Sequence, residues 1–199
     1  MRKNVIQKLA TILFVILFAA LGAAAEQAEP RATIDVSGHP FKGPANAPVT
    51  VVVFFDYFCG PCKKLEPVLH QLVEKYPKEV KLVPKFLPHV REFSKNAAIA
   101  AMAADDQGKF WEFHDKQFEN QSVLDDSMVI EIARMLKMDV KRFENKRQDS
   151  AFEELIDHDL NEAGGLEIHG TPQVYINGRV FRQRTFEAFV DAIDKELKR

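Results

Sequence analysis

Two cysteines, Cys59 and Cys62, are the residues of this chain whose type and spacing most directly suggest chemistry, and they are its only cysteines. A pair with two residues between them can cycle between dithiol and disulfide, one thiolate attacking and the other resolving a mixed disulfide. A purely structural disulfide is the less favoured interpretation, because so short a loop removes little entropy from the unfolded chain. A zinc half-site would need two more ligands, and no second cysteine pair or His-x-x-x-His motif follows. The sequence therefore favours redox chemistry and predicts no metal site.

The cysteines lie where a predicted strand meets a predicted helix. Residues 49–55 are β-branched or aromatic almost throughout, as in a strand buried on both faces, and residues 61–76 carry apolar side chains at helical spacing. Cys59 would then lie at the N-terminal end of a helix, where unpaired amides and the positive dipole end stabilise an anion. We predict that Cys59 is a thiolate nucleophile near neutral pH and that Cys62 resolves. This strand, corner and helix resemble the thioredoxin superfamily.

Residues 1–25 are typical of a secretory signal peptide, with three basic residues in the first eight positions, an apolar run at 12–21 and alanines at 23–25. An uncleaved anchor is the alternative, because residues 9–25 approach the roughly 20 residues of a membrane span. Cleavage would leave 174 residues with one redox pair and no spare thiol. This suits the periplasm or another oxidising space outside the cytoplasm.

The charge and length of the chain limit the remaining possibilities. Removing the signal takes away three basic and no acidic residues, so the formal charge falls from -2 to -5. Such a charge does not suggest a nucleic-acid-binding protein. The remaining length suits a single core, and no internal repeat divides it.

Strand signals flank a long helical stretch. We predict a weak strand at Thr33–Val36 and a strand at Val80–Leu87, in which Pro84 indicates an edge position or a bulge. A hairpin follows later, turning at Asn177-Gly178 because type I′ turns need positive φ at both central positions. The predicted organisation is an α/β fold in which residues 26–92 and 166–199 form the thioredoxin-like domain and residues 93–165 form an all-helical insertion.

Capping residues mark the predicted helices. Within the insertion we expect Ser94 to cap residues 95–106, Asp125 or Asp126 to cap 127–136, Asp139 to cap 140–146, and Ser150 to precede 152–163. After the hairpin strands, 173–176 and 179–181, the last helix begins after Arg184 or Thr185.

With these elements in place, the chain resembles the DsbA-like thiol:disulfide oxidoreductases over most of its length beyond the signal. The resemblance is carried by the run from Phe54 to Cys62, by the segment 110–115 within a helical region, and by Gly170-Thr171-Pro172 before a hairpin. It implies a thioredoxin fold interrupted by a helical domain. It also implies that Cys59 is the nucleophile and Cys62 the resolving cysteine.

The resemblance assigns further roles around the pair. Gly60 and Pro61 correspond to the dipeptide that tunes the redox potential. Thr171 and Pro172 correspond to a cis-proline pair that faces the cysteines and leaves a backbone group free to bind an extended client peptide. No cofactor beyond the redox-active disulfide is implied.

Two residues near these motifs are candidates of a weaker kind. Phe58 immediately precedes Cys59 and could help to form an apolar surface that binds unfolded chains. His169 precedes the Gly170-Thr171-Pro172 motif, and a protonated imidazole there would favour the Cys59 thiolate. The alternative for His169 is a solvated loop histidine.

Two departures from the family pattern matter. Thioredoxin and DsbA carry a buried acid six residues before the first cysteine, where this chain has Val53. Asp56 does not replace it, because alternate strand residues face opposite sides. We therefore hypothesise that water or His169 accepts the proton of Cys62. In addition, Gly60-Pro61 is the dipeptide of thioredoxin, a reductant, whereas the fold suggests an oxidase.

The sequence thus predicts an exported thiol:disulfide oxidoreductase, acting as an oxidase in disulfide bond formation on unfolded or partly folded secreted proteins. By resemblance, a membrane partner would reset its redox state, and we expect a monomer. One alternative is a periplasmic reductase or isomerase kept reduced by a membrane electron donor. Another is a peptide-binding chaperone module in which the cysteines are incidental.

Overall fold

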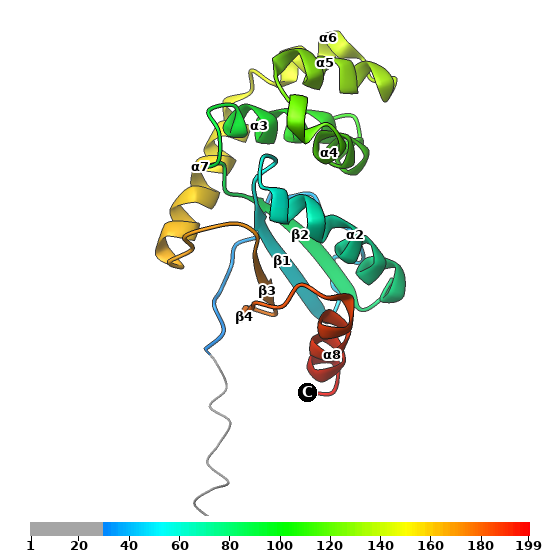
Figure 1. Cartoon of the computed structure of the whole chain (residues 1–199), viewed down its shortest axis with the longest axis vertical. Helices are drawn as coiled ribbons and strands as arrows, with labels where there is room; N and C mark the ends of the chain where they lie inside the picture. Colours follow the sequence, from blue (N-terminus) through cyan, green and yellow to red (C-terminus); the bar gives the residue numbers. More distant parts are fainter. Residues whose placement is uncertain (1–29) are drawn as a thin grey trace, which may run out of the picture. The chain divides into compact units, whose positions relative to one another are not determined.

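The computed structural model describes residues 30–199, so the predicted signal peptide at 1–25 lies outside the described residues. Residues 31–199 form one compact unit around a four-stranded sheet with the strand order β2-β1-β3-β4 (Figure 1). The strands are β1 (Val49–Phe55), β2 (Val80–Phe86), β3 (Gln173–Ile176) and β4 (Arg179–Phe181). β1 is parallel to β2 and antiparallel to β3, which pairs antiparallel with β4. The predicted strand before the cysteine corner, the turn at residues 56–62 between β1 and the following helix, is therefore confirmed, as are the two strands of the hairpin.

The position of Pro84 agrees with the prediction that β2 is an edge strand. β2 pairs with β1 along one side only, where Pro84 lies opposite Val53. The other side carries a single isolated bridge, between Lys42 and Leu82. A proline is tolerated there because an edge strand has no second ladder that needs its missing N–H.

Eight helical segments occur in the described part of the chain, and five α-helices of the insertion follow β2 before the chain returns to β3. The segments are α2 (Gly60–Lys75), α3 (Ser94–Asp105), α4 (Phe110–Glu119), the 3-10 helix η1 (Gln121–Val123), α5 (Asp126–Met135), α6 (Val140–Lys146), α7 (Ser150–Gly165) and α8 (Phe186–Leu197). The predicted caps are confirmed for Asp139 and, of the two candidates named, for Asp125, and Thr185 also caps the last helix. Each of these side chains accepts a hydrogen bond from the backbone amide three residues on. None of the described helices combines the length and the apolar character that a membrane crossing requires.

The predicted strand at Thr33–Val36 is wrong. The segment is extended but belongs to no sheet, and Ala32 N donates to Gly178 O at 2.8 Å. Its apolar side chains Ala32, Ile34 and Val36 instead pack against one face of the sheet. The alternation of apolar and polar residues in this segment matches its partly buried side chains. A segment can pack side chains on the face of a sheet without pairing with a strand through backbone hydrogen bonds.

Ser94 does not cap α3 as predicted. Its hydroxyl accepts a hydrogen bond from Arg91 N at 3.0 Å and donates one to Asp56 Oδ1, also at 3.0 Å. No side chain caps this helix, which follows Phe93. The serine is therefore used to connect the loop after β2 to the loop after β1.

The sheet separates two apolar layers. Alternate residues of β1, including Val51, Val53 and Phe55, face the larger core, to which α2, α8 and the insertion contribute. The others, Val52 and Phe54, face a smaller layer covered by the end of α7 and by residues 32–36. In Figure 1 the helices α3 to α6 gather beyond the end of the sheet at which β1 turns into α2. The insertion is therefore placed beside the cysteine corner.

Candidate active site

Cys59 lies at the N-terminal end of α2, as the sequence predicted, and is the N-cap residue of that helix. Its backbone is extended, with φ -79° and ψ 111°, and its Sγ accepts a hydrogen bond from Cys62 N at 3.3 Å. The Cys59 thiol can also donate to Thr171 O, 3.2 Å away. Pro61 occupies the first turn of α2, where the N–H that it lacks would have no helical partner. The local sequence thus places a sulfur where the helix offers unpaired donors.

These contacts favour the thiolate of Cys59. The pKa of Cys59 is lowered to about 6, chiefly by hydrogen bonding from the Cys62 side chain. The contact with Thr171 and the hydrogen bond from the Cys62 amide lower this pKa further, whereas burial raises it. Asp56 acts weakly in the opposite direction. A thiol with this pKa is mostly ionised at neutral pH, as a nucleophile and leaving group in disulfide exchange must be.

Cys62 behaves in the opposite way. It is 1% exposed, and burial, together with its hydrogen bond to Cys59, raises its pKa well above the ordinary range of a thiol. Both cysteines are free thiols in this structure, which therefore describes the dithiol form. A thiolate at the start of a helix next to a protonated, buried thiol is the arrangement needed for a nucleophile and a resolving group.

The carboxylate of Asp56 holds the turn that carries Cys59. It accepts hydrogen bonds from the backbone N–H groups of Phe58, His89 and Val90, each at 2.8 Å, and from the Ser94 hydroxyl. These donors come from the loops after β1 and after β2. The carboxylate therefore joins the two loops at the end of the sheet where the cysteines lie.

The helical insertion also contacts the turn directly. Gln121 Nε2, in η1, donates to Tyr57 O at 2.7 Å and to Cys59 O at 3.1 Å. Lys63 Nζ, on α2, donates to Glu119 O at 3.2 Å. Nothing in the local sequence around Gln121 marks it for this role, because the contact spans more than sixty residues of chain.

On the other side of the cysteines lies the Thr171-Pro172 loop. Its peptide bond is cis, the isomer implied by the resemblance. Arg184 donates through Nη2 to Pro172 O at 2.7 Å and through Nη1 to Phe181 O at 3.0 Å. Burial lowers the pKa of the Arg184 guanidinium, while the Cys62 sulfur acts to raise it. A cation thus holds the loop within electrostatic range of Cys62.

Over residues 30–199 the structure shows no contact that gives Phe58 or His169 a part in the chemistry of the two cysteines. Phe58 is only 9% exposed and packs beneath the Arg91 guanidinium, 5.1 Å from its ring centroid, and against Phe93. His169 is exposed, and no contact with either cysteine is found for it in the described structure. Val53 is 3% exposed within the larger core. A role for Phe58 in client binding and one for His169 in tuning stay predictions.

A polar chain missed by sequence reasoning runs behind the turn. Tyr57 OH lies 3.0 Å from His114 Nδ1, and His114 Nε2 lies 3.1 Å from Glu66 Oε2. Tyr57 and His114 are each 1% exposed, enclosed by aromatic rings that include Phe55 and Phe118. No local pattern shows this chain, because its members come from the turn, from α4 and from α2.

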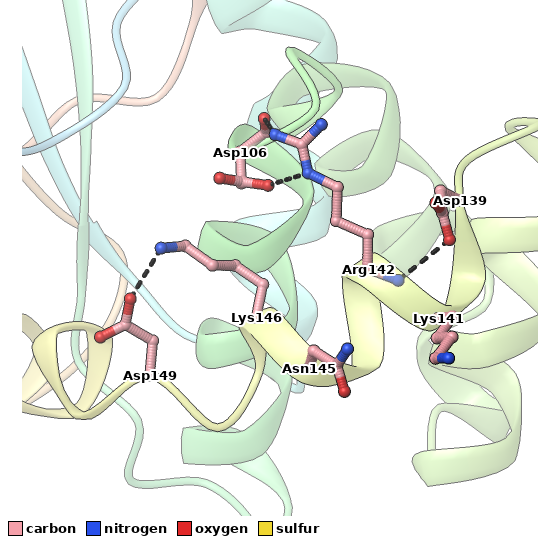
Figure 2. A pocket seen from close by; sticks show the side chains of 7 residues that line it. All are labelled: Asp106, Asp139, Lys141, Arg142, Asn145, Lys146 and Asp149. Carbon is pink, nitrogen blue, oxygen red and sulfur yellow. Dashed lines mark hydrogen bonds and ion pairs between the residues drawn. The ribbon is translucent and has the colours of Figure 1, made fainter.

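A second hollow lies away from the cysteines, around α6 (Figure 2). Two ion pairs lie along it: Arg142 Nε is 2.7 Å from Asp106 Oδ2, and Lys146 Nζ is 2.7 Å from Asp149 Oδ2. Asp139 caps the helix through Arg142 N. Since these charges neutralise one another or complete a helix end, the hollow does not compete with the cysteine corner as a functional site.

The fold and the cysteine corner define the class of this protein. The family model described as Thioredoxin matches residues 35–195, which is most of the chain. With the inserted helices and the cis-proline loop beside Cys59, the chain belongs to the thioredoxin superfamily as a DsbA-like member.

Particular relatives support this assignment. The chain is 31% identical over 169 residues to the "Probable disulfide bond formation protein D" of Bacillus cereus, covering 79% of this chain and 78% of that protein. It resembles the crystal structure of oxidised BdbD from Bacillus subtilis with a TM-score of 0.76 and 24% identity, covering 86% of this chain and 99% of that one. It also resembles the thiol-disulfide exchange protein alpha-DsbA2 of Wolbachia pipientis, with a TM-score of 0.73 and 25% identity, covering 79% and 86%.

A different kind of relative is much longer. The chain is 34% identical over 163 residues to "Na(+)/H(+) antiporter NhaA 3" of Salinispora tropica, covering 81% of this chain but 25% of that protein. The chain therefore spans about a quarter of the length of this relative.

Proposed function

We propose that this protein is an exported thiol:disulfide oxidoreductase that donates the Cys59–Cys62 disulfide to protein clients. The observation that carries the proposal is the contrast between the two thiols, with the pKa of Cys59 lowered to about 6 and that of the buried Cys62 raised. Stabilising the thiolate stabilises the dithiol form, and this makes the disulfide form more oxidising.

In the proposed reaction a client thiolate attacks the Cys59 sulfur of the disulfide. A bond forms between the client and Cys59, while the Cys62 sulfur leaves and takes up a proton. A second client thiolate then attacks the client sulfur of this mixed disulfide and releases the Cys59 thiolate. The client has lost two electrons, and the Cys59–Cys62 pair has gained them.

The pKa of Cys59 also sets an expected reduction potential. One pKa unit is worth about 1.4 kcal/mol, which for this two-electron couple is about 30 mV. Thioredoxin combines a thiolate pKa of about 7 with about −270 mV, and DsbA one of about 3.5 with about −120 mV. A Cys59 pKa of about 6 then corresponds to roughly −240 mV from the first reference and roughly −195 mV from the second.

A pair in this range can still act as an oxidase. Structural disulfides of secreted proteins have potentials below about −300 mV, so transfer from the Cys59–Cys62 pair to such a client would be favourable by about 3 kcal/mol or more. Export would keep the protein away from the reducing cytoplasm, and the predicted signal peptide at 1–25 supports that part of the proposal. A membrane redox partner would restore the disulfide, and we propose a monomer.

A reductase or isomerase is the second candidate, and the thioredoxin-type Gly60-Pro61 dipeptide favours it. The equilibrium reduction potential of the pair, measured in glutathione and dithiothreitol buffers, separates the two. A value between about −190 and −240 mV is expected for the oxidase. A value at or below that of thioredoxin would contradict it and favour a reductase kept in the dithiol form.

The chaperone alternative is tested with a double variant, Cys59→Ser and Cys62→Ser. An oxidoreductase should lose all disulfide transfer to a reduced, unfolded client such as ribonuclease, while a peptide-binding module should still suppress client aggregation to the wild-type extent. Retained suppression without any disulfide transfer by the wild-type protein would overturn the proposed activity.

A further inference from the structure

The structure brings three potential metal ligands together where α2 meets α4. Glu66 and His70 are four residues apart on α2 and therefore share one face of that helix. Asp115 reaches the same place from α4. His70 Nε2 lies 3.1 Å from Asp115 Oδ1 and 3.9 Å from Glu66 Oε2, and all three ligand atoms lie within 4.8 Å of one another. We infer that Glu66, His70 and Asp115 form a binding site for a zinc ion.

The spacing and the donor types fit zinc. Bonds of about 2.0–2.2 Å at tetrahedral angles place two ligand atoms about 3.4 Å apart. The separations of 3.1 Å and 3.9 Å from His70 Nε2 lie on either side of this value. Imidazole nitrogen suits zinc, whereas magnesium and calcium take oxygen ligands. Three protein ligands leave a fourth position for water.

The nitrogen atoms at this place have unsatisfied polarity. His70 Nε2 and His114 Nε2 are buried and find no hydrogen-bond partner among the described residues, although each lies 3.1 Å from a carboxylate oxygen. His114 itself is 1% exposed and faces Glu66 from the interior. Buried polar atoms without partners are few in native proteins. An ion bound between His70 and the two carboxylates would give His70 Nε2 a partner, and His114, 3.1 Å from Glu66 Oε2, would orient that carboxylate.

Solvent and charge also allow an ion to enter. The three residues border a groove of about 380 Å³, and the side chains of His70 and Asp115 are each 33% exposed. Glu66 and Asp115 bring two negative charges, which complement a divalent cation. Lys42, whose charge acts on both His70 and Asp115, opposes this attraction without cancelling it. A bound ion would connect the active-site helix directly to the insertion.

The inference does not rest on the proposed disulfide exchange, and its test uses the oxidised full chain so that the cysteine thiols cannot bind zinc. Titration with zinc chloride in a calorimeter should show one ion per chain with a micromolar or tighter dissociation constant. Loss of an outer-shell partner already costs roughly 10- to 100-fold in metal affinity, so His70→Ala should weaken binding by more than about 100-fold. The matched control is His158→Ala, a histidine on α7 with a 52% exposed side chain, which should bind zinc as the wild type does.

A second variant, Asp115→Asn, guards against a folding defect in His70→Ala, and the circular dichroism spectrum of each variant is recorded first. Addition of zinc should raise the melting temperature of the wild type and of His158→Ala but not that of the two ligand variants, because an ion that binds only the folded state stabilises it. Absence of binding to the oxidised wild type would overturn the inference. So would equal affinity in folded Asp115→Asn, or an equal affinity for magnesium, which would exclude the imidazole as a ligand.

Discussion

Asp56 and Asp159 are both buried carboxylates with no exposed side-chain surface, and they are stabilised in different ways. Asp159, on α7, lies 2.9 Å from Lys85 Nζ and 2.9 Å from His39 Nε2, and it accepts a hydrogen bond from Phe86 N. Asp56, at the end of β1, takes its hydrogen bonds from three backbone amides and a serine hydroxyl. One carboxylate is paired with a lysine, whereas the other takes its hydrogen bonds from neutral donors, with the His89 ring 3.9 Å away.

The difference follows from what each carboxylate is next to. Asp159 joins α7 to β2 and to the segment before β1, and the Lys85 charge compensates its burial in a layer without redox chemistry. Asp56 lies close enough to Cys59 to act on the pKa of that thiol. Neutral donors hold the active-site turn without placing a lysine next to the thiolate. The low pKa of Cys59 therefore depends on contacts of the sulfur itself.

The largest effect is expected for Asp159→Asn. Removing one partner of a buried ion pair typically costs about 3–5 kcal/mol, and we expect the lower end here because Lys85 keeps Glu162 as a partner. Urea unfolding of the oxidised protein measures the loss. The control is Asp157→Asn on the same helix, whose 51% exposed carboxylate pairs with Lys95 and should contribute under about 1 kcal/mol. Equal losses of unfolding free energy in the two variants would show that the buried carboxylate contributes no more to stability than the exposed one.

A loss of stability together with a change at the active site is expected for Asp56→Asn. Hydrogen bonds to a charged group contribute about 1.5–3 kcal/mol, and an amide cannot accept all four. Because Asp56 raises the pKa of Cys59, its neutralisation should lower that pKa below about 6. The thiolate absorbance, titrated in the reduced protein, measures the change. A higher pKa in this variant would mean that Asp56 acts chiefly by positioning the donors of the Cys59 sulfur.

The lowered pKa of Cys59 also determines how the stability of the reduced protein changes with pH. The pKa of Cys59 is about 6 in the folded protein and about 8.5 in an unfolded chain. The unfolded state therefore binds more protons between these values, and the stability of the reduced protein should rise with pH from about 6 toward about 8.5 and fall as pH drops through about 6. Urea unfolding of the reduced wild type across this range should show the slope, and Cys59→Ser should lack it.

Much of the fold could be predicted because its signals are local. Asp125, Asp139 and Thr185 start helices with their own side chains, and Asn177-Gly178 turns the hairpin at positive φ values of 47° and 77°. The position of Cys59 at the N-terminal end of α2 was predicted correctly for the same reason.

What the sequence did not reveal depends on chain segments that meet only after folding. Serine is a residue type that often caps helices, yet the Ser94 hydroxyl donates its hydrogen bond to the buried carboxylate of Asp56. Gln121 lies in an ordinary polar stretch, and its contact with the Cys59 turn appears only once the insertion packs there. In the sequence, Glu66 and His70 have the pattern of an exposed helix face, and only the packing of α4 places Asp115 beside them. Local chemistry identifies donors and acceptors, whereas tertiary packing decides their partners.

A third buried carboxylate, introduced by Val53→Glu, would complete the comparison, and its expected effect on the rate of exchange is the smallest of these changes in energy. Val53 lies between Pro84 on β2 and Val174 on β3, so a carboxylate there would have neither the lysine of Asp159 nor the amide donors of Asp56. Burial without partners raises the pKa of a carboxyl group, which suits it to accept the proton of Cys62 near neutral pH. Resolution of a preformed mixed disulfide on Cys59 should become about tenfold faster, equivalent to about 1.4 kcal/mol.

The control for this variant is Val53→Gln, which adds a side chain of similar size that cannot take up the proton. Stopped-flow measurement of release from the mixed disulfide should show acceleration for glutamate alone, with the rate rising as pH passes through the pKa of the new carboxyl. An unchanged rate in Val53→Glu would count against the idea that the wild type lacks a proton acceptor at this place. It would then indicate that deprotonation of Cys62 does not limit resolution, and that the cation of Arg184, within electrostatic range of Cys62, already supplies the stabilisation that its thiolate needs.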